Sequence, residues 1–536
     1  MGKIFELVVI FIWTPQAIGH LLNWLYWWQV KEYRFDRFKI LLGGAGGREN
    51  LEIGFIAIKF LLIVFSFLFK DLLWLTLLVF ILLDARLFYK FLAGSARRPV
   101  FTGRAKSIFG TGLLFIYLAG LLVISLEKKY LQEIILAGEV TLVMSPYLGI
   151  LWTNVITKRV KKREIERAKK RLGQVKPTVI GITGSYGKGT TKEFLFHLLS
   201  QKYKAAKTTG SENTEFGIAR KTNSLLKDKT KFFVVEMGAY KKGEVKALTD
   251  IVSPQIGIIT GIEPQHLSLF GSLEEIMRAK FELITALPKG GVAVFNFSNE
   301  FCRELAQKAK KLPTRLKVLG YFVSNGNRKH DSDLVSRILA VDTEGITFEV
   351  MSDGEKRKIY SPLKGSHFVE NLSGAVLVAR HLGLSWNDIV SGGRTVRQPE
   401  KTMQVYQSKD GVIIDNSFNT TPKGFEAAIN YLSLFNKKKA VITSGIIELG
   451  KETHSIHKKL AVLMSESIDK VILTNRDFLK SFKEGLLNQP EKLDFINEPR
   501  KLREKLMELT SRGFVILIEG RMPRIVEDSL KEYRND

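Results

Sequence analysis

Apolar residues are concentrated in the first 155 positions of this 536-residue chain, where they form five long runs. The runs cover about Ile4–Trp28, Ile53–Phe69, Leu72–Leu92, Ile108–Leu126 and Leu131–Trp152. Each approaches the roughly 20 residues that a helix needs to cross about 30 Å of hydrocarbon. We therefore expect a membrane domain over residues 1–155, with about five transmembrane helices.

The connections between these runs differ in charge, and this difference predicts an orientation. Residues 31–50, 97–106 and 158–171 are rich in Lys and Arg, whereas the other connections are short and less basic. Basic loops remain on the cytoplasmic side of a membrane. We therefore expect a multi-pass protein of the cytoplasmic (inner) membrane, with its N-terminus outside and its catalytic domains in the cytoplasm. Residues 156–175 are expected to form a basic juxtamembrane linker on anionic headgroups.

The net charge of +27 is compatible with nucleic acid, an anionic membrane face or anionic substrates. Much of it lies beside the apolar runs, and no aromatic-studded sheet or groove-reading helix pattern accompanies it. The lipid bilayer is therefore the expected partner, and nucleic acid is not. The single cysteine, Cys302, excludes an intrachain disulfide and a cluster of cysteine metal ligands.

From Pro177 onward, short β-branched runs alternate with stretches of helical spacing. This rhythm predicts a parallel sheet covered on both faces by helices. Residues 314–362 look more antiparallel and are expected to form a β insertion, and a second α/β series begins near residue 403. We expect a central domain over residues 176–400 and a Rossmann-like C-terminal α/β domain over residues 401–536.

The stretch "VIGITGSYGKGTTKEF", residues 179–194, combines an apolar strand, a Gly-rich turn, a Lys and a helix. Such a turn directs backbone N–H groups at phosphate oxygens, and Lys188 would neutralise their charge. The strict phosphate-loop pattern is not met, because Gly189 stands where a Ser or Thr hydroxyl usually contacts Mg²⁺. Thr190 follows directly and is the candidate replacement. We predict a P-loop-type ATPase domain that uses ATP and Mg²⁺.

Seven motifs, read in order, resemble the Mur ligase family, and in particular its MurF-like branch, the ligases that add D-Ala-D-Ala to a UDP-MurNAc-tripeptide. The motifs are "GITGSYGKGTTKEF", "TTGSENTEFGIA", "VVEMGAYKKGEV", "IITGIEPQHLSLFGSLEEIMRAKFELI", "GSHFVENLSGAVLVA", "IIDNSFNTTPKGFEAAI" and "SGIIELGKETHSIHKKL". The resemblance covers roughly residues 175–536. It implies an ATP-dependent amide ligase that activates a carboxylate as an acyl phosphate for attack by an amine.

The resemblance also implies roles for individual residues. Lys188, Lys280 and His266 would be catalytic. Metal ligands would be Thr190, Glu236, His266 and, if carbamylated, Lys280. The ATP-binding residues would be Gly184, Ser185, Tyr186, Gly187, Lys188, Gly189, Thr190, Thr191, Asn371, Lys401, Asp415 and Asn419.

Three features depart from the family pattern. Gly189 removes a hydroxyl, and Lys401 stands where the family usually has Arg, which loses bidentate geometry on phosphate. The family's N-terminal UDP-binding domain is replaced by the apolar runs. The expected substrates are therefore a UDP-MurNAc-peptide-like or lipid-linked cell-wall precursor, together with an amino acid or D-Ala-D-Ala.

Two alternatives remain open at this point. The first is a poly-γ-glutamate-synthase-like ligase, which would use the same chemistry on a different polymer. The second is a non-catalytic, ATP-binding membrane scaffold with a degenerate Mg²⁺ site, which Gly189 favours.

Overall fold

The computed structural model of the chain describes residues 2–43, 51–66, 72–92, 97–125, 131–210, 213–264, 267–324, 331–407, 411–418, 420–447 and 449–533. These residues form two compact units, residues 1–160 and residues 161–536. Each unit is described by itself below.

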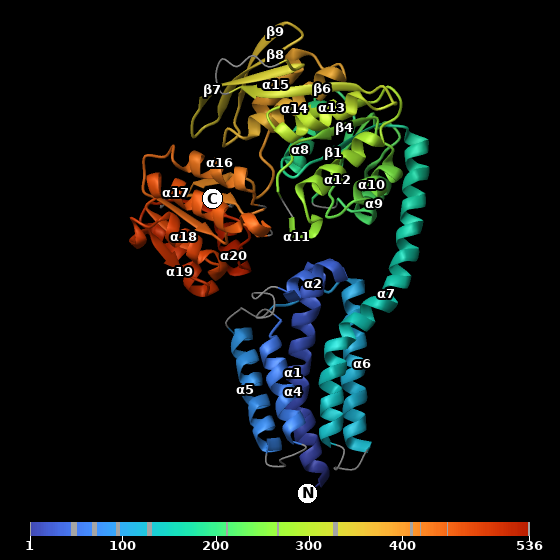
Figure 1. Cartoon of the computed structure of the whole chain (residues 1–536), viewed down its shortest axis with the longest axis vertical. Helices are drawn as coiled ribbons and strands as arrows, with labels where there is room; N and C mark the ends of the chain where they lie inside the picture. Colours follow the sequence, from blue (N-terminus) through green and yellow to red (C-terminus); the bar gives the residue numbers. More distant parts are fainter. Residues whose placement is uncertain are drawn as a thin grey trace. The chain divides into compact units, whose positions relative to one another are not determined.

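The first unit is helical over the residues described (Figure 1). Its helices are α1 (Gly2–Val30), α2 (Phe35–Gly43), α4 (Ile53–Ser66), α5 (Leu72–Leu92), α6 (Gly103–Ser125) and α7 (Leu131–Val175), the last of which ends in the second unit. Each of the five predicted apolar runs lies largely within one of these helices. The apolar side chains of α1 pack against those of α4, α5, α6 and α7 in one core.

Three of the described helical segments are long and apolar enough to cross a membrane: Leu7–Val30, Gly103–Ser125 and Ala137–Val175. The apolar helix Ile53–Phe65 is shorter. Helix α5 carries Asp84, Arg86 and Lys90 in its second half. Five membrane crossings and the orientation of the N-terminus therefore stay predictions.

The helical unit buries a polar cluster among α1, α4 and α7. The Lys59 side chain is 0% exposed, and its ammonium lies 2.6 Å from Oε2 of Glu139. Lys59 Nζ also donates to Oε1 of Gln16 at 2.9 Å, and Trp13 Nε1 donates to Oε1 of Glu139 at 2.9 Å. Both ionic groups are therefore paired and hydrogen-bonded, which buried charges require.

The second unit begins with a nine-stranded sheet in the order β2-β3-β1-β4-β5-β6-β7-β8-β9 over the described residues. Its strands are β1 (Thr178–Thr183), β2 (Ala205–Lys207), β3 (Phe232–Glu236), β4 (Ile256–Ile259), β5 (Val292–Asn296), β6 (Lys317–Ser324), β7 (Leu334–Val341), β8 (Ile346–Ser352) and β9 (Glu355–Ser361). Its helices are α8 (Lys188–Ser200), α9 (Glu215–Leu225), α10 (Glu244–Val252), α11 (Leu267–Phe270), α12 (Leu273–Thr285), α13 (Glu300–Lys310), α14 (Phe368–His381) and α15 (Trp386–Thr395).

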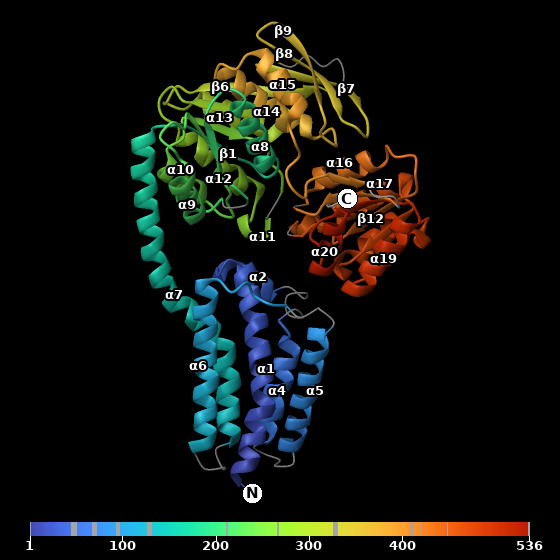
Figure 2. The ribbon, with the colours of Figure 1, turned by 180° about the vertical axis from the view of Figure 1, so that it is seen from behind.

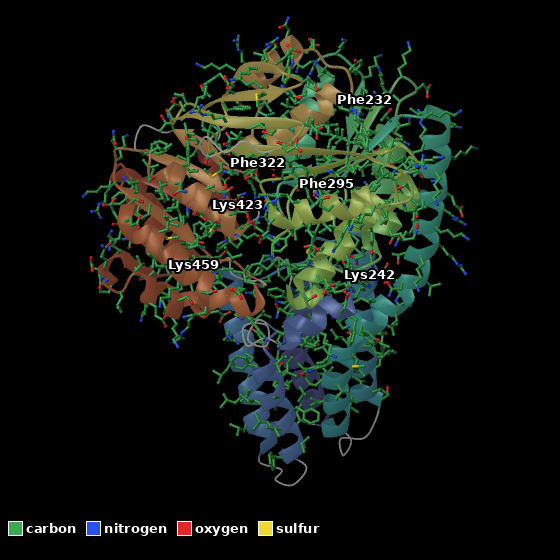
Figure 3. All side chains as sticks on the ribbon, turned by 45° about the horizontal axis from the view of Figure 1, so that its top comes forward. Phe232, Lys242, Phe295, Phe322, Lys423 and Lys459 are labelled. Carbon is green, nitrogen blue, oxygen red and sulfur yellow. The ribbon has the colours of Figure 1, made fainter. Side chains whose placement is uncertain are left out.

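Helices cover both faces of the parallel strands, as the buried runs predicted. Side chains of α8, α14 and α15 share one apolar core with Phe232, whereas α9, α10, α12 and α13 share the other with Phe295 (Figure 3). The predicted antiparallel insertion is confirmed for β7–β8 and β8–β9 and wrong for β6, which pairs parallel with β5. Helix α13 connects β5 to β6, and a helical crossover of this kind joins parallel strands.

The C-terminal domain, orange to red in Figure 2, forms over the residues described a six-stranded sheet in the order β10-β11-β15-β12-β13-β14, parallel except for the β10–β11 pair. Its strands are β10 (Gln404–Gln407), β11 (Val412–Asn416), β12 (Lys439–Thr443), β13 (Lys470–Leu473), β14 (Leu493–Phe495) and β15 (Val515–Glu519). Its α-helices are α16 (Pro422–Leu432), α17 (Thr453–Ser467), α18 (Leu479–Gly485), α19 (Pro499–Ser511) and α20 (Arg524–Glu532), with single turns at Gly450–Glu452, Arg476–Phe478 and Pro490–Lys492. Apolar side chains of α16, α17 and α18 pack on one face, and those of α19 and α20 on the other.

Candidate active site

The Gly-rich loop connects the end of β1 to the start of α8. Gly187 caps the helix with a φ of 75°, in the left-handed region that favours glycine. A Cβ at this position would lie 2.2 Å from Oδ1 of Asn371, so a side chain has no room. The loop therefore lies against α14 and presents the first N–H groups of a 13-residue helix. Such N–H groups are a binding site for phosphate.

Lys188 is the first residue of α8 and is held back against the loop. Its ammonium donates to the carbonyl oxygens of Gly184 at 2.8 Å and Ser185 at 3.1 Å. Burial lowers the pKa of Lys188, and the charge of Glu236 opposes that change. The ammonium therefore lies at the loop carbonyls, within reach of any phosphate bound by the same loop.

Glu236 ends β3, the neighbour of β1, and is 9% exposed. Its Oε2 accepts from the Lys192 ammonium at 3.1 Å, and its Oε1 accepts from Asn213 Nδ2 at 3.3 Å. A Cβ on Gly189 would lie 3.3 Å from Oε2 of Glu236. The side chain of a Ser or Thr at position 189 would thus point toward the Glu236 carboxylate.

These residues fit a divalent cation. Carboxylate and hydroxyl oxygens are the ligands that Mg²⁺ prefers, and the Glu236 carboxylate lies on the pocket wall, where Lys192 is its present partner. Thr190 lies beside Gly189 on the wall of the same pocket. His266, the other predicted ligand, lies outside the described residues. Over the described part of the chain, no group of three or more His, Cys, Asp or Glu side chains gathers in a way that could hold a metal.

Lys280 lies on α12 and is 3% exposed. Its ammonium is 3.4 Å from the carbonyl oxygen of Ala239. Burial, together with the positive charge of Lys188, lowers the pKa of Lys280 to about 7. A large fraction of this side chain is therefore a neutral amine near neutral pH, which is the form that reacts with CO₂.

Of the nucleotide contacts predicted after residue 370, some lie at the pocket and Asp415 does not. Asn371 on α14 accepts from Thr191 Oγ1 at 3.3 Å, directly beside the loop. Lys401 lies 3.1 Å from Glu527 and lines the pocket. Asp415 is fully buried in β11, and its neighbour Asn416 lines the pocket wall in its place. Asn419 lies outside the described residues.

A pocket of about 930 Å³ collects these groups. Among the predicted residues it is lined by Ser185, Tyr186, Gly187, Lys188, Gly189, Thr190, Glu236, Asn371 and Lys401. Gly184, Thr191 and Lys280 are not on its wall. A cavity of this size holds a molecule as large as a nucleotide.

The pocket also contains charged residues that the sequence analysis did not select: Lys192, Glu193, Lys207, Glu370, Arg397, Glu400 and Lys423. Lys192 had a usable signal, because residues four apart lie on the same helix face and Lys192 follows Lys188 at that spacing. Glu370 and Lys423 had none, since their proximity arises only from the folded arrangement of α14 and α16.

Two family models match the chain. The Mur ligase middle domain matches residues 182–379, and the Mur ligase glutamate ligase domain matches residues 403–522.

Curated relatives agree with these matches. The chain is 28% identical over 372 residues to the UDP-N-acetylmuramoyl-tripeptide–D-alanyl-D-alanine ligase of Bacillus subtilis, covering 68% of this chain and 78% of the relative. It is 30% identical over 302 residues to the ligase of the same name from Synechocystis, covering 56% of this chain and 62% of the relative. The second alignment thus spans less than two thirds of the relative's length.

Solved structures share the fold. MurF from Acinetobacter baumannii superposes with a TM-score of 0.61 at 24% identity, covering 70% of this chain and 81% of that one. MurF from Thermotoga maritima in complex with ADP superposes with a TM-score of 0.57 at 24% identity, covering 70% of this chain and 83% of that one.

Proposed function

Because the chain belongs to the Mur ligase family of ATP-dependent ligases, we propose that it joins a carboxylate of a cell-wall peptide precursor to the amine of an amino acid or of D-Ala-D-Ala. The observation that carries this proposal is the pocket at the start of α8. It brings the loop amides with Lys188, Glu236 and Asn371 together from three segments that are far apart in the sequence. An enzyme that transfers phosphate to a carboxylate needs such a combination of phosphate donors and cation ligands.

The proposed reaction has two steps. A carboxylate oxygen of the precursor attacks the γ-phosphorus of ATP, and ADP leaves. The amine nitrogen then attacks the carbonyl carbon of the acyl phosphate, phosphate leaves, and the nitrogen loses a proton as the amide forms. In this scheme the loop N–H groups and Lys188 bind the phosphates, and Asn371 and Lys401 orient the nucleotide. Glu236, Thr190 and His266 would hold Mg²⁺, which would supply positive charge to neutralise the phosphates.

Lys280 has a separate proposed role. Its neutral amine nitrogen would attack CO₂ and lose a proton, which gives an anionic carbamate suited to a second cation. Burial supports this role, because it lowers the pKa of the Lys280 side chain to about 7 and so supplies the reactive form. The hydrogen-bond partner of Lys280 is the carbonyl oxygen of Ala239, three residues after Glu236, which ends β3.

A second candidate function is a non-catalytic scaffold that binds ATP. The observations that favour it are Gly189, which supplies no hydroxyl, and the Lys192 ammonium, which already pairs with Glu236 at 3.1 Å. For catalysis, Lys192 must share this carboxylate with the cation. In a scaffold, the ion pair would persist after ATP binds.

The helical unit supports location in a membrane. Many large apolar side chains on α1, α5 and α6 are exposed, among them Phe11, Leu82, Leu114 and Leu122. Lipid solvates such side chains, whereas water does not. We propose that this unit anchors the enzyme in the inner membrane, where a lipid-linked precursor is a substrate alternative to a UDP-linked one.

The test is ADP release by the full chain in detergent. UDP-MurNAc-tripeptide with D-Ala-D-Ala is compared with other pairs of carboxylate and amine, including lipid-linked precursors. We expect ADP release that requires both substrates and Mg²⁺. Binding of ATP with no ADP from any pair would overturn the ligase proposal in favour of the scaffold.

A further inference from the structure

Lys423, near the start of α16, has two contacts with the central domain. Its ammonium donates to Oε1 of Glu370 on α14 at 2.6 Å. The same ammonium lies 5.3 Å from the ring centroid of Tyr186 in the Gly-rich loop, within the range of a cation–π contact. The Lys423 and Glu370 side chains are 40% and 15% exposed, so their ion pair is only partly screened by water.

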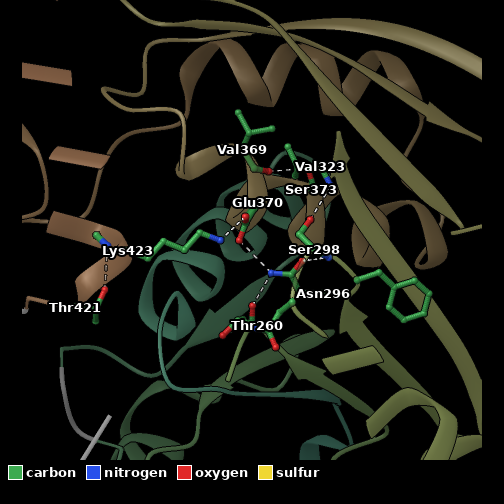
Figure 4. A network of polar contacts seen from close by, with 12 residues as sticks. Thr260, Asn296, Ser298, Val323, Val369, Glu370, Ser373, Thr421 and Lys423 are labelled. Atoms are coloured by element: carbon green, nitrogen blue, oxygen red, sulfur yellow. Dashed lines mark hydrogen bonds and ion pairs between the residues drawn. The ribbon is translucent and has the colours of Figure 1, made fainter. Parts of the chain in front are cut away.

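Glu370 is in turn connected to the interior of the central sheet (Figure 4). Its Oε2 accepts from Asn296 Nδ2 at 3.1 Å, and the same Nδ2 donates to the carbonyl oxygen of Thr260 at 2.9 Å. The Thr260 hydroxyl donates to the carbonyl oxygen of Tyr186. A continuous set of polar contacts therefore runs from α16 through α14, the end of β5 and the residue after β4 to the Gly-rich loop.

The charges around Lys423 are mostly negative. Burial raises the pKa of Glu263 to about 7, Lys423 opposes that rise, and the charges of Glu370 and Glu426 add to it. Lys423 is thus the cation that balances three carboxyl groups next to a pocket for an anionic ligand. Without it, those carboxylates would repel a nucleotide phosphate.

We propose that Lys423 and Glu370 are positioning residues that hold α16 against the Gly-rich loop and thereby set the affinity of the pocket for nucleotide. The inference rests on the proposed function only in taking the pocket ligand to be a nucleotide. It requires neither catalysis nor a particular pair of substrates. It assigns unequal roles to the two residues, because Lys423 both pairs with Glu370 and neutralises Glu263 and Glu426.

The first experiment measures ADP binding by calorimetry with the full chain in detergent. Lys423→Met keeps the length of the side chain and removes its charge, and we expect about tenfold weaker binding. Glu370→Gln keeps the shape and an acceptor for Asn296, and we expect only about threefold weaker binding. The control is Lys161→Met, which removes an ion pair to Glu215 of similar length and exposure, 2.8 Å and 39%/35%, that does not line the pocket.

A charge exchange, Lys423→Glu with Glu370→Lys, separates pairing from simple loss of a side chain. The new glutamate faces Glu263 and Glu426, and Asn296 keeps its amide nitrogen on the Thr260 carbonyl oxygen, so we expect the exchange to recover only part of the ADP affinity lost in Lys423→Met. Unchanged ADP affinity in Lys423→Met would overturn the proposal. An exchange variant that binds no better than Lys423→Met would do the same.

The second experiment reads the position of the C-terminal domain without any substrate. Cys302 is fully buried, so spin labels can be placed selectively at introduced cysteines, Gln307→Cys on α13 and Leu487→Cys, which are both at exposed positions. With ADP present, we expect one narrow distance distribution that broadens in Lys423→Met and is unchanged in Lys161→Met. Distance distributions of equal width in the unmodified chain, Lys423→Met and Lys161→Met would refute positioning by Lys423 and Glu370. Broadening in a chain that releases no ADP would leave this inference standing and overturn only the ligase proposal.

Discussion

The two units of the chain arrange polar and apolar side chains in opposite ways. Residues 1–160 contribute most of the large exposed apolar side chains that the structure describes, although they are less than a third of the chain, and they bury the Lys59–Glu139 pair among apolar helices. The α/β unit buries its apolar strands and places charged side chains of both signs around one pocket. With the helical unit in lipid, as proposed, and the α/β unit in water, the same physical rule explains both, because each unit would present to its surroundings what those surroundings solvate.

The difference also concerns what a buried charge does. In the helical unit, Lys59 and Glu139 have short contacts with each other and with Gln16 and Trp13. In the pocket, Lys188 contacts loop carbonyl oxygens and Glu236 contacts the Lys192 ammonium. A bound ligand can replace both kinds of partner. We therefore expect the first pair to contribute to stability and the second to contribute to chemistry.

The largest effect is expected from Lys59→Met. It leaves the Glu139 carboxylate buried without its cation, at a cost of about 3–5 kcal/mol to the helical unit. Thermal unfolding in detergent measures this, with exposed Lys39→Met as the control. Adding Glu139→Leu to Lys59→Met should recover most of the loss. An unchanged unfolding midpoint in Lys59→Met would show that the pair is not a stabilising element.

The next effect is on chemistry alone. Lys188→Ala and Glu236→Ala each remove a charge expected at the transferred phosphate, and we expect ADP release to fall by about a hundredfold to a thousandfold. Unfolding of the helical unit should be unaltered in both variants, which would sharpen the contrast between the units. Undiminished release in both variants would be incompatible with the assigned site.

A pH effect should follow from Lys280. Its pKa is lowered to about 7, so the neutral amine increases as pH rises. At pH 8 roughly 90% of the side chain is neutral and at pH 6 roughly 10%. After removal of CO₂, addition of bicarbonate should restore activity more completely at pH 8 than at pH 6, and Lys280→Arg should show no recovery. Recovery that is independent of pH and present in Lys280→Arg would exclude the carbamate.

The smallest effect is expected from Thr190→Ala. If the Thr190 hydroxyl replaces the one that Gly189 lacks, its removal should raise the Mg²⁺ concentration needed for half-maximal activity by about threefold to tenfold. Thr191→Ser is the matched control, since the Thr191 hydroxyl is buried against Asn371 and is retained. Identical Mg²⁺ dependence in Thr190→Ala would mean that another group holds the cation.

Much of the fold was predictable because it depends on local patterns. The five apolar runs lie largely within helices, and the short buried runs around Val179, Val234 and Val294 lie within parallel strands. The parallel pairing of β6 was missed because the alternation of charged and apolar residues around the start of this strand resembles that of an edge hairpin. The decisive signal was helix α13, which precedes β6.

The site was predictable to the extent that its residues follow strands directly. Glu236 and the Gly-rich loop follow adjacent strands of one sheet, so they had to lie close together. Glu370 and Lys423 belong to different domains, and no spacing in the sequence indicates their contact. Asp415, a predicted nucleotide contact, lies in β11 with its side chain buried rather than on the pocket wall. The predictions for His266 and Asn419 stay untested.

The strand order has a consequence for the synthesis of the chain. The loop after β1 is among the first parts of the α/β unit to leave the ribosome, yet Asn371, which contacts Thr191, follows 180 residues later. Parallel strands and their crossovers close only after such long segments exist. The apolar helices of the proposed membrane anchor therefore leave the ribosome before any nucleotide pocket has formed, so the nascent chain would carry its anchor before it could consume ATP.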